Sequence, residues 1–520
     1  MVGDFLKDCH VANDPLDQSK GQKQEIQDVD SFSRANRLAM KKSALIAGSL
    51  SRSGKRILHL DPNEYYGGAE AALSLAEAES WASRCAEATD TAVFSHASIT
   101  KPPPSGEKKL LSSRAYSLAL APHLIYAKSN TVPALVSSQC HNQLDFQAVG
   151  SWFVLDSASN AQSGLIRVPS SREDVFQDTA LSLKAKRGLM KFLRFVANFE
   201  EQTETWHDSK DTPFPAFLEQ KFALPAASHG PILALTMSTA PSSTTSTGYA
   251  LPRIAQHLRS IGIFGPGFGA VLPKWGGLAE IAQVACRAGA VGGGVYVLNK
   301  AIKEATKSEE DNRITLKLSD AEQVSTTWLC GSAETMQTIS PAPDASSGSS
   351  ATVSRSISVI SSPLSALFPS TSEGGVTPAG AVVVVPSSNN DGPPVHILVH
   401  TSEAGECPMN QCVAYASVAL SSDVGYAQID QAIANMLSNF DQEPTPEVLW
   451  RLQYQQRIPA ATDGAVLMDG SFISLPAMAG DLVLADSVLN GVQQAWQSIT
   501  NEDENMFMKF TSRSEMEDEE

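Results

Sequence analysis

The sequence predicts an α/β fold (α+β) in which a discontinuous, sheet-bearing domain is interrupted by a smaller helical domain. Three observations lead to this prediction. Residues 43–61 have the pattern of a helix followed by a buried strand, residues 189–199 repeat apolar side chains at helical spacing, and strand-like sequence returns after Gly262. A helical segment between two sheet-forming segments indicates an inserted domain.

The N-terminal part of the chain carries an incomplete β-α-β unit. Residues 1–42 are rich in charged and amide side chains and lack a sustained hydrophobic period, so we expect them to be disordered or atypical. A short amphipathic helix is predicted over 43–53 and a buried strand over 56–61. The usual first strand and its glycine loop should precede Ser43, and the sequence there has neither.

The remaining boundaries follow from changes of character along the chain. We expect a first domain at 43–168 and 264–500 and a helical second domain at 169–263, with a helix over 278–290 and a strand over 295–299 in the later part of the first domain. Two further segments are predicted to be flexible from their composition, the Ser/Pro/Gly-rich 340–350 and the acidic tail 501–520.

Composition excludes several classes of function. The net charge of -17 and the absence of a dense Lys/Arg cluster argue against nucleic acid as a partner. Seven cysteines without paired close spacing indicate a reducing compartment and no zinc site, and no apolar run reaches the roughly 18 residues needed to cross a bilayer. We therefore expect a cytosolic protein without a metal.

Asp61 allows two interpretations. An acidic residue at the end of a strand is where a Rossmann-type unit binds a ribose, but that role needs the missing glycine loop. The alternative is an Asp that starts a turn before Pro62. We expect the turn and no bound flavin or nicotinamide cofactor.

Tyr65 and Tyr66 precede the glycines Gly67 and Gly68 in the next loop. Large amphipathic side chains at a loop are typical of protein interfaces, although a partly buried loop anchor uses the same residue type. This segment, RILHLDPNEYYGG, resembles the signature of the Rab GDP-dissociation inhibitor and Rab escort protein superfamily. Similar blocks follow in the same order at 167–201, 257–300 and 447–457.

The resemblance implies a flavoprotein-like first domain with an inserted helical domain, and it implies a binding platform for Rab GTPases in the GDP state. Tyr66, Glu280, Arg287 and Val297 match platform positions of the superfamily, and Tyr65, Gly67 and Gly68 belong to the same loop. Glu280, Gln283 and Arg287 lie at i, i+3 and i+7 of the predicted helix, a spacing that by itself indicates only a solvated face.

The inserted domain distinguishes escort proteins from dissociation inhibitors. Phe176 and Arg187 match the Phe and Arg with which escort proteins contact the α-subunit of the Rab geranylgeranyltransferase α/β heterodimer, so the resemblance implies an escort protein. Ile357, Val359 and Leu364 align with the region that holds the Rab C-terminus, although an alternating strand of this kind is also typical of a core.

The prenyl group carried by Rab needs a shelter, for which Phe192, Val196 and Phe199 are candidates; a plain helix core is the alternative. The implied protein is not an enzyme: it presents the Rab cysteines to the transferase and delivers the product to membranes. The competing predictions are a general Rab GDP-dissociation inhibitor, which has no transferase contact, and a flavin-dependent oxidoreductase of the same fold.

Overall fold

The computed structural model describes residues 41–88, 92–103, 109–155, 164–169, 182–308, 311, 313–339, 351–370, 375–387, 391–458, 466–476 and 479–510. Phe176 and the segments 1–40, 340–350 and 511–520 therefore lie outside the described residues. None of the described helices is long and apolar enough to cross a membrane.

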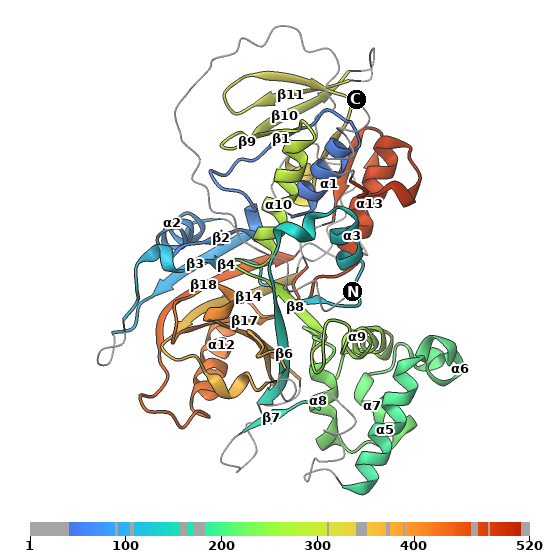
Figure 1. The fold of residues 1–520 in the computed structure, drawn as a ribbon, viewed down its shortest axis with the longest axis vertical. Coiled ribbons are helices and arrows are strands. Elements are labelled where there is room, and N and C mark those ends of the chain that lie inside the picture. The colour runs from blue at the N-terminus through green and yellow to red at the C-terminus, as the bar shows by residue number, and fades with distance from the viewer. Residues whose placement is uncertain are drawn as a thin grey trace.

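A large mixed sheet forms the centre of the molecule (Figure 1). Its strands follow the order β3-β18-β14-β17-β16-β15-β6-β8-β5, and β7 pairs with β6 off this path. In chain order these strands are β3 (Phe94–Thr100), β5 (Ile125–Tyr126), β6 (Phe146–Leu155), β7 (Leu165–Arg167), β8 (Ala270–Pro273), β14 (Ala351–Ile360), β15 (Gly380–Val385), β16 (Val395–Thr401), β17 (Cys412–Val418) and β18 (Val448–Ile458).

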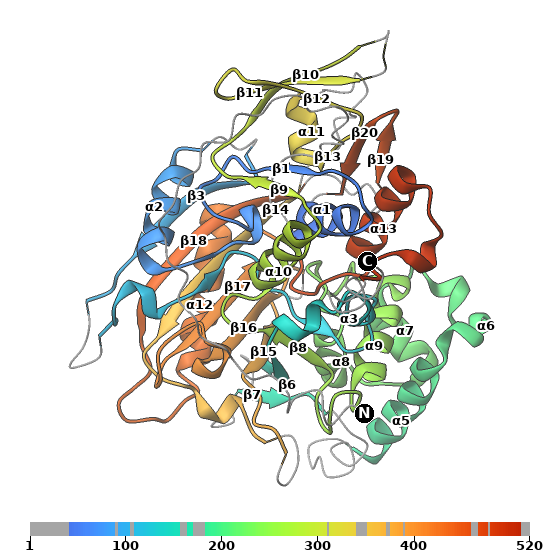
Figure 2. The same ribbon diagram turned by 45° about the horizontal axis from the view of Figure 1, so that its top comes forward.

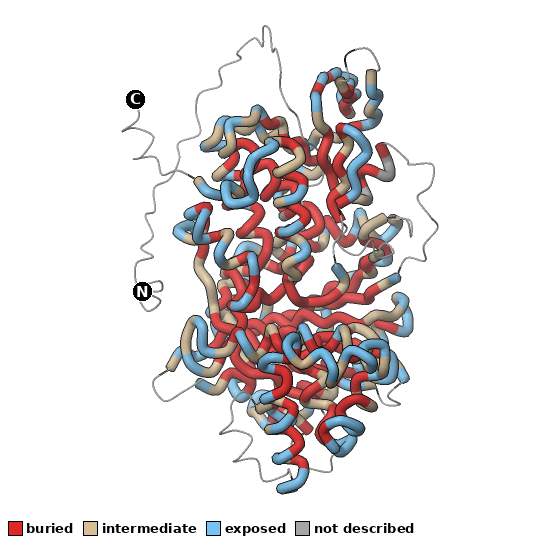
Figure 3. Tube along the Cα trace, turned by 90° about the vertical axis from the view of Figure 1, so that its right-hand side faces the viewer, coloured by how far each residue is buried: buried red, intermediate tan, exposed pale blue. Residues whose placement is uncertain are grey.

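Strand β14 is paired on both edges and its residues 353–360 are buried on both faces, which contradicts one prediction. It pairs antiparallel with both β17 and β18, and α12 (Ser422–Leu437) packs on one side of the sheet. Ile357, Val359 and Leu364 are buried to 1% exposure or less. The predicted surface groove at these residues is wrong, because all three are buried. Figure 3 shows that buried segments run through the middle of the molecule.

Helices α1 (Lys41–Arg52), α10 (Leu278–Val291) and α13 (Ser487–Thr500) lie side by side at the other end of the molecule (Figure 2). Helix α1 is buried on nearly all sides between its neighbours, so its polar side chains face other parts of the protein instead of solvent. Its buried polar groups have partners: Lys42 Nζ donates to the Pro476 oxygen at 2.7 Å. Gly48 lets α10 approach closely, since a Cβ there would lie 2.8 Å from the Ala285 oxygen.

Smaller sheets complete the first domain. β1 (Leu58–Leu60) pairs parallel with β9 (Val295–Val297), as expected for part of a β-α-β unit. The other small strands are β2 (Ala72–Leu73) with β4 (Leu118–Ala119), β10 (Ile302–Lys307) with β11 (Ile314–Leu318) and β12 (Gln323–Thr326), and β13 (Leu329–Ser332) with β20 (Phe472–Leu475) and β19 (Leu467–Asp469). Three further helices are α2 (Leu75–Ala86), α3 (Thr131–Ser137) and α11 (Ala333–Ile339).

A group of helices stands between β7 and β8 in the sequence and packs beside the central sheet (Figure 1). Its described members are α5 (Leu183–Ala197), α6 (Thr203–Trp206), α7 (Phe214–Phe222), α8 (His229–Ala234) and α9 (Thr247–Ser260). Helix α5 begins where the Ser182 side chain accepts a hydrogen bond from the Ala185 amide at 3.2 Å. Its apolar stripe packs on α7 and α9.

Several single-turn helices cap loops; they are η1 (Gly68–Glu70), η2 (Ser113–Ala115), η3 (Cys140–Gln143), η4 (Phe199–Glu201), η5 (His207–Ser209), η6 (Ala226–Ser228), η7 (Ser365–Leu367), η8 (Ser402–Ala404) and η9 (Glu504–Met506). The predicted disorder of the tail is wrong for residues 501–510. Met508 is buried, and the Phe507 ring lies 5.5 Å from that of Trp496. Apolar side chains among the acidic ones give this stretch a surface to bury.

Candidate functional site

The exposed face of α10 carries the predicted polar residues. The helix buries Leu278, Ile281 and Ala285, while Gln283 and Arg287 are exposed and Glu280 is half-buried. Gln283 Nε2 donates to Glu280 Oε1 at 3.3 Å, and Arg287 Nη1 donates to Gln143 Oε1 at 3.0 Å. The structure therefore brings Glu280, Gln283 and Arg287 to one face, next to η3.

Glu280 is in an unfavourable place for a charge. Partial burial raises the pKa of its carboxyl, and the positive charge of Arg287 opposes that rise. A carboxylate that loses hydration in this way gains from a new donor brought by a partner.

Tyr66 lies beside the same helix. Its side chain is 38% exposed, whereas Tyr65 is half-buried against the core. Burial raises the pKa of the Tyr66 phenol, with further contributions from the thiol of Cys286 on α10 and the carboxylate of Asp61. The loop turns at Gly67, where φ is 97° and a Cβ would lie 2.9 Å from the Ala71 Cα. The close packing of Gly67 on Ala71 thus fixes the loop from which Tyr66 extends.

Hydrogen bonds of Asp61 and Val297 connect this loop to strand β9. Asp61 Oδ1 accepts hydrogen bonds from the Asn63 backbone at 2.9 Å and from Asn63 Nδ2 at 2.8 Å, and the Asp61 side chain is fully buried. The turn interpretation is therefore confirmed. The Asp61 amide donates to the Val297 oxygen at 2.9 Å, so half-buried Val297 joins β9 to the tyrosine loop.

An apolar hollow of about 250 Å³ lies next to η3, whose His141 forms part of its lining. Its walls include Val132 and Val136 of α3, Phe146 of β6, Phe264 and Phe268 of the loop before β8, and Val376. Val136 and Val376 are each nearly half exposed. The sequence analysis missed this hollow; its only local signal was the i, i+4 pairs 132/136 and 264/268.

The lipid-shelter residues are filled core. Phe192, Val196 and Phe199 are each exposed by 4% or less. The Phe192 ring lies 5.3 Å from that of Phe222, and the Phe199 ring lies 5.5 Å from that of Trp206. In this conformation the core interpretation holds, and the three side chains leave no room for a prenyl chain.

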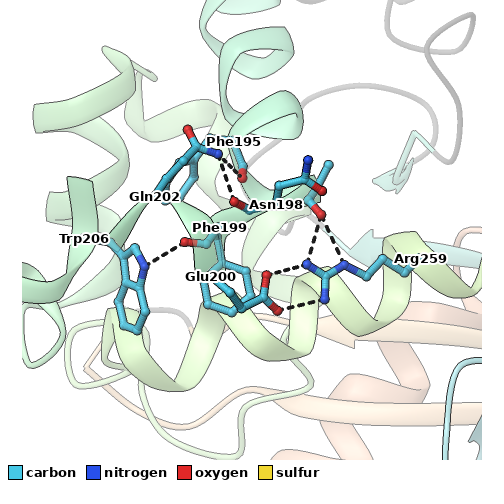
Figure 4. Close-up of polar contacts among 8 residues, drawn as sticks. Phe195, Asn198, Phe199, Glu200, Gln202, Trp206 and Arg259 are labelled. Atoms are coloured by element: carbon cyan, nitrogen blue, oxygen red, sulfur yellow. Dashed lines mark hydrogen bonds and ion pairs between the residues drawn. The ribbon is translucent and has the colours of Figure 1, made fainter. Parts of the chain in front are cut away.

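The end of this core is closed by an ion pair (Figure 4). Arg259 Nη1 donates to Glu200 Oε1 at 2.8 Å, and its Nε and Nη2 donate to the Ala197 oxygen at 3.2 and 2.9 Å. The Trp206 indole donates to the Phe199 oxygen at 3.0 Å. Hydrogen bonding to Arg259 lowers the pKa of the Glu200 carboxyl.

Arg187 is exposed on α5. The exposed side chains of Lys184, Lys191 and Arg194 lie at helical spacing from it, so four cations follow one face of a helix in an acidic protein. This basic face was not anticipated from the sequence. The predicted shared face of Phe176 and Arg187 lies outside the described residues.

Comparisons with known proteins agree with this architecture. The family model described as GDP dissociation inhibitor matches residues 39–440. The Rab proteins geranylgeranyltransferase component A of Saccharomyces cerevisiae is 30% identical over 257 residues, 49% of this chain and 41% of that protein. Rab escort protein 1 of Arabidopsis thaliana is 24% identical over 562 residues, 92% of this chain and 94% of that protein.

The match to the first curated relatives spans only about two fifths of their length, 41% of the Saccharomyces cerevisiae protein and 39% of the component A protein of Candida albicans. Among solved structures, the Rab GDI of Plasmodium falciparum has a TM-score of 0.64 at 18% identity and covers 91% of this chain and 99% of that one. An oxidoreductase of Methanosarcina mazei has a TM-score of 0.57 at 12% identity, covering 90% and 100%. These likenesses confirm the predicted flavoprotein-like fold.

Proposed function

Because this chain belongs to the GDP dissociation inhibitor family, whose model matches most of its length, we propose that it is a Rab escort protein. In this role it binds a GDP-bound Rab GTPase, presents the Rab C-terminal cysteines to Rab geranylgeranyltransferase and delivers the prenylated product to membranes. The chain itself performs no chemistry. The names of the relatives from Saccharomyces cerevisiae and Arabidopsis thaliana support the escort role.

The observation that carries the proposal is the exposed face built from α10 and the tyrosine loop. Tyr66 offers an aromatic surface, Arg287 a guanidinium that donates one hydrogen bond, at 3.0 Å to Gln143, and Glu280 a partly dehydrated carboxylate. Aromatic and arginine side chains dominate the energetics of protein interfaces. We call these three residues the platform and assign the folded part of the Rab to it.

The C-terminal tail of the Rab is assigned to the apolar hollow rather than to β14. Gln143 in η3 accepts the bond from Arg287, and His141 of the same turn lines the hollow. A chain leaving the platform therefore reaches the hollow by crossing one turn. The hollow takes apolar side chains of the tail between Val136 and Phe264, so that the terminal cysteines extend beyond it.

The transferase is assigned to the basic face of α5. Arg187 stands in the middle of this face, and Phe176 precedes it by eleven residues. An acidic surface on the transferase would complement the four cations. Holding the Rab and the transferase on one carrier raises the effective concentration of the tail cysteines at the active site of the transferase.

A general Rab GDP-dissociation inhibitor is the second candidate. It is favoured by the fold similarity to the Plasmodium falciparum Rab GDI and by a guanosine nucleotide diphosphate dissociation inhibitor of Arabidopsis thaliana that is 27% identical over 264 residues. The basic face of α5 favours the escort role, since extraction of a Rab from a membrane needs no transferase contact. A flavin oxidoreductase is disfavoured because the carboxylate of Asp61 holds a turn.

The test is transfer of labelled geranylgeranyl to a GDP-loaded Rab by the purified transferase, with and without this protein. Transfer that depends on the protein is expected. Arg287→Ala should weaken Rab binding about tenfold and Arg187→Ala should weaken transferase binding about tenfold, each leaving the other affinity within about twofold. Rab binding without any stimulated transfer would favour the dissociation inhibitor, and a flavin absorption band in the pure protein would favour the oxidoreductase.

A further inference from the structure

Trp275 exposes its indole at the entrance to α10. All seven tryptophans of the chain are described, and Trp275 alone is exposed, at 44%. The other six are buried or half-buried. Trp275 stands three residues before the first residue of α10, and nothing in the sequence analysis singled it out. An exposed indole is uncommon on a surface that meets only water.

The backbone of Trp275 is strained. Its φ is 63°, in the left-handed region that a bulky side chain rarely adopts. Such a conformation persists only where the surroundings enforce it, and it gathers at functional sites. The strain therefore indicates that the position of this side chain serves a purpose beyond connecting β8 to α10.

Three contacts enforce the conformation. The Trp275 amide donates to the Ala404 oxygen at 2.8 Å, and the Ser117 hydroxyl donates to the Trp275 oxygen. The indole lies directly on Gly405, where a Cβ would stand 2.5 Å from Trp275 Cδ1. A glycine is required at 405 both for this approach and for its own φ of 74°.

The loop that holds Trp275 is itself fixed to the sheet by a buried carboxylate. Glu406 is fully buried and its Oε2 lies 2.9 Å from His400 Nδ1 on β16, while the Tyr415 hydroxyl on β17 donates to the same oxygen at 2.8 Å. The Ser117 amide donates to the Glu406 oxygen at 3.1 Å. Trp275 is thus presented on a rigid support rather than on a mobile loop.

The support places Trp275 where the two parts of the platform meet. The next residue, Gly276, lies against Ala72: a Cβ there would be 2.3 Å from the Ala72 Cβ. The segment that begins at the tyrosine loop therefore reaches the N-terminal end of α10 at Ala72. Trp275 extends the platform at this end, and Lys274 adds a positive charge with Nζ 5.1 Å from the ring centre.

We propose that Trp275 is a further contact residue of the platform, whose indole packs on an apolar side chain of the GDP-bound Rab GTPase. The proposal rests on the proposed function, from which it takes the partner. Trp, Tyr and Arg are the residues most enriched at energetically dominant interface positions. The extended platform contains one residue of each of these three types: Trp275, Tyr66 and Arg287. Pre-positioning of the indole spares the complex the entropy of ordering it.

The test measures the affinity of GDP-loaded Rab for four variants of the full chain. Trp275→Ala is expected to weaken binding about 20-fold, and Trp275→Phe only about threefold, because a smaller ring retains part of the contact. Gly405→Ala keeps the indole but forces it to move, so it should also weaken binding by about fivefold. Leu467→Ala, at a 54% exposed leucine on β19, is the matched control and should leave the affinity unchanged.

A spectroscopic readout separates contact from damage to the fold. With 5-fluorotryptophan incorporated, the ¹⁹F resonance missing from Trp275→Phe should shift when Rab is added. If wild type binds Rab, Arg287→Ala weakens it and Trp275→Ala stays within twofold, the Trp275 proposal is overturned and the proposed function stands. If wild type binds no Rab, both are overturned. Weakening by Trp275→Ala with an unchanged melting temperature supports the contact.

Discussion

Two exposed arginines on helices show how differently a surface can treat the same side chain. Arg259 on α9 makes four hydrogen bonds, two to the Ala197 oxygen and two to the Glu200 carboxylate (Figure 4). Arg287 on α10 makes one, to the side-chain oxygen of Gln143. A guanidinium has five N–H donors, so the first is nearly saturated within the chain and the second retains most of its capacity.

The difference separates a surface that is stabilised within the chain from the surface that we propose binds Rab. Arg259 joins two helices and caps the C-terminal end of α5, where the backbone carbonyls have no helical partner. Arg287, with Tyr66 and Glu280, joins little within the chain. Substitution of Arg259 should therefore lower mainly the stability of the fold, and substitution of Arg287 should lower mainly the affinity for the partner.

The largest effect is expected beneath the platform. Gly48→Ala places a methyl group 2.8 Å from the Ala285 oxygen and should push α1 and α10 apart, at a cost of about 2 kcal/mol in the free energy of unfolding. Rab affinity should fall as well, because the face of α10 moves. Denaturant unfolding and a binding titration measure the two effects.

Gly230→Ala is the matched control for that substitution. The new methyl group would meet only Val154 Cγ1, at 3.9 Å, and alanine is the better helix former. Its unfolding free energy should equal or slightly exceed that of the wild type. An equal loss of unfolding free energy in both variants would show that the close α1–α10 contact is not the cause of the loss in Gly48→Ala.

Arg259→Ala should cost about 1 kcal/mol of stability and leave Rab affinity unchanged, since its four bonds lie within the helical group. The effect depends on pH. Arg259 lowers the pKa of Glu200, so this stabilisation is present above the usual glutamate range and is lost as pH falls through the lowered pKa. The stability difference between wild type and variant, measured at pH 7 and again at strongly acidic pH, should shrink.

Glu280→Gln should raise stability at pH 7 by about 0.5 kcal/mol while weakening Rab binding. The raised pKa of Glu280 means that folding disfavours its charge. The destabilisation of the wild type by this charge is therefore present above the raised pKa and is lost as pH falls from it to the usual glutamate range. Below that range the carboxyl is protonated in both the folded and the unfolded state, and the two proteins should unfold alike. A variant less stable than wild type at pH 7 contradicts this view of the platform.

Arg287→Ala should have the smallest effect on folding, less than about 0.5 kcal/mol, because one exposed hydrogen bond is lost. Thermal unfolding compared side by side with Arg259→Ala tests this directly. A loss as large as that of Arg259→Ala would remove the distinction between the two arginines.

Local spacing predicted some elements well. Helix α10 was expected over 278–290 and spans Leu278–Val291, because its apolar residues recur at helical spacing and its polar residues share the other face. The face with Glu280, Gln283 and Arg287 followed from the same spacing. What these residues bind could not follow from it, and rested on the resemblance.

Long-range packing explains the failures. An alternating strand such as 355–360 suggests one open face, but β14 lies inside the sheet with both faces covered. The apolar hollow combines side chains of α3 and β6 with those of the loop before β8, which lies more than 100 residues further along the chain. No window of sequence contains that neighbourhood. Trp275 could not be predicted from the sequence, because its strained backbone and its exposed position depend on a contact with the distant Gly405.

The contact of α1 with both α10 and α13 has a consequence for synthesis of the protein. The Trp496 indole near the C-terminal end donates to Ser53 Oγ at 3.0 Å, and α1 in turn supports α10. A nascent chain on the ribosome can form α1 and α10 early, but their shared underside stays uncovered until α13 emerges. Helix α13 must therefore be synthesised before the support of the platform is complete, so a chain truncated before α13 would expose the apolar underside of α1 and α10 to chaperones.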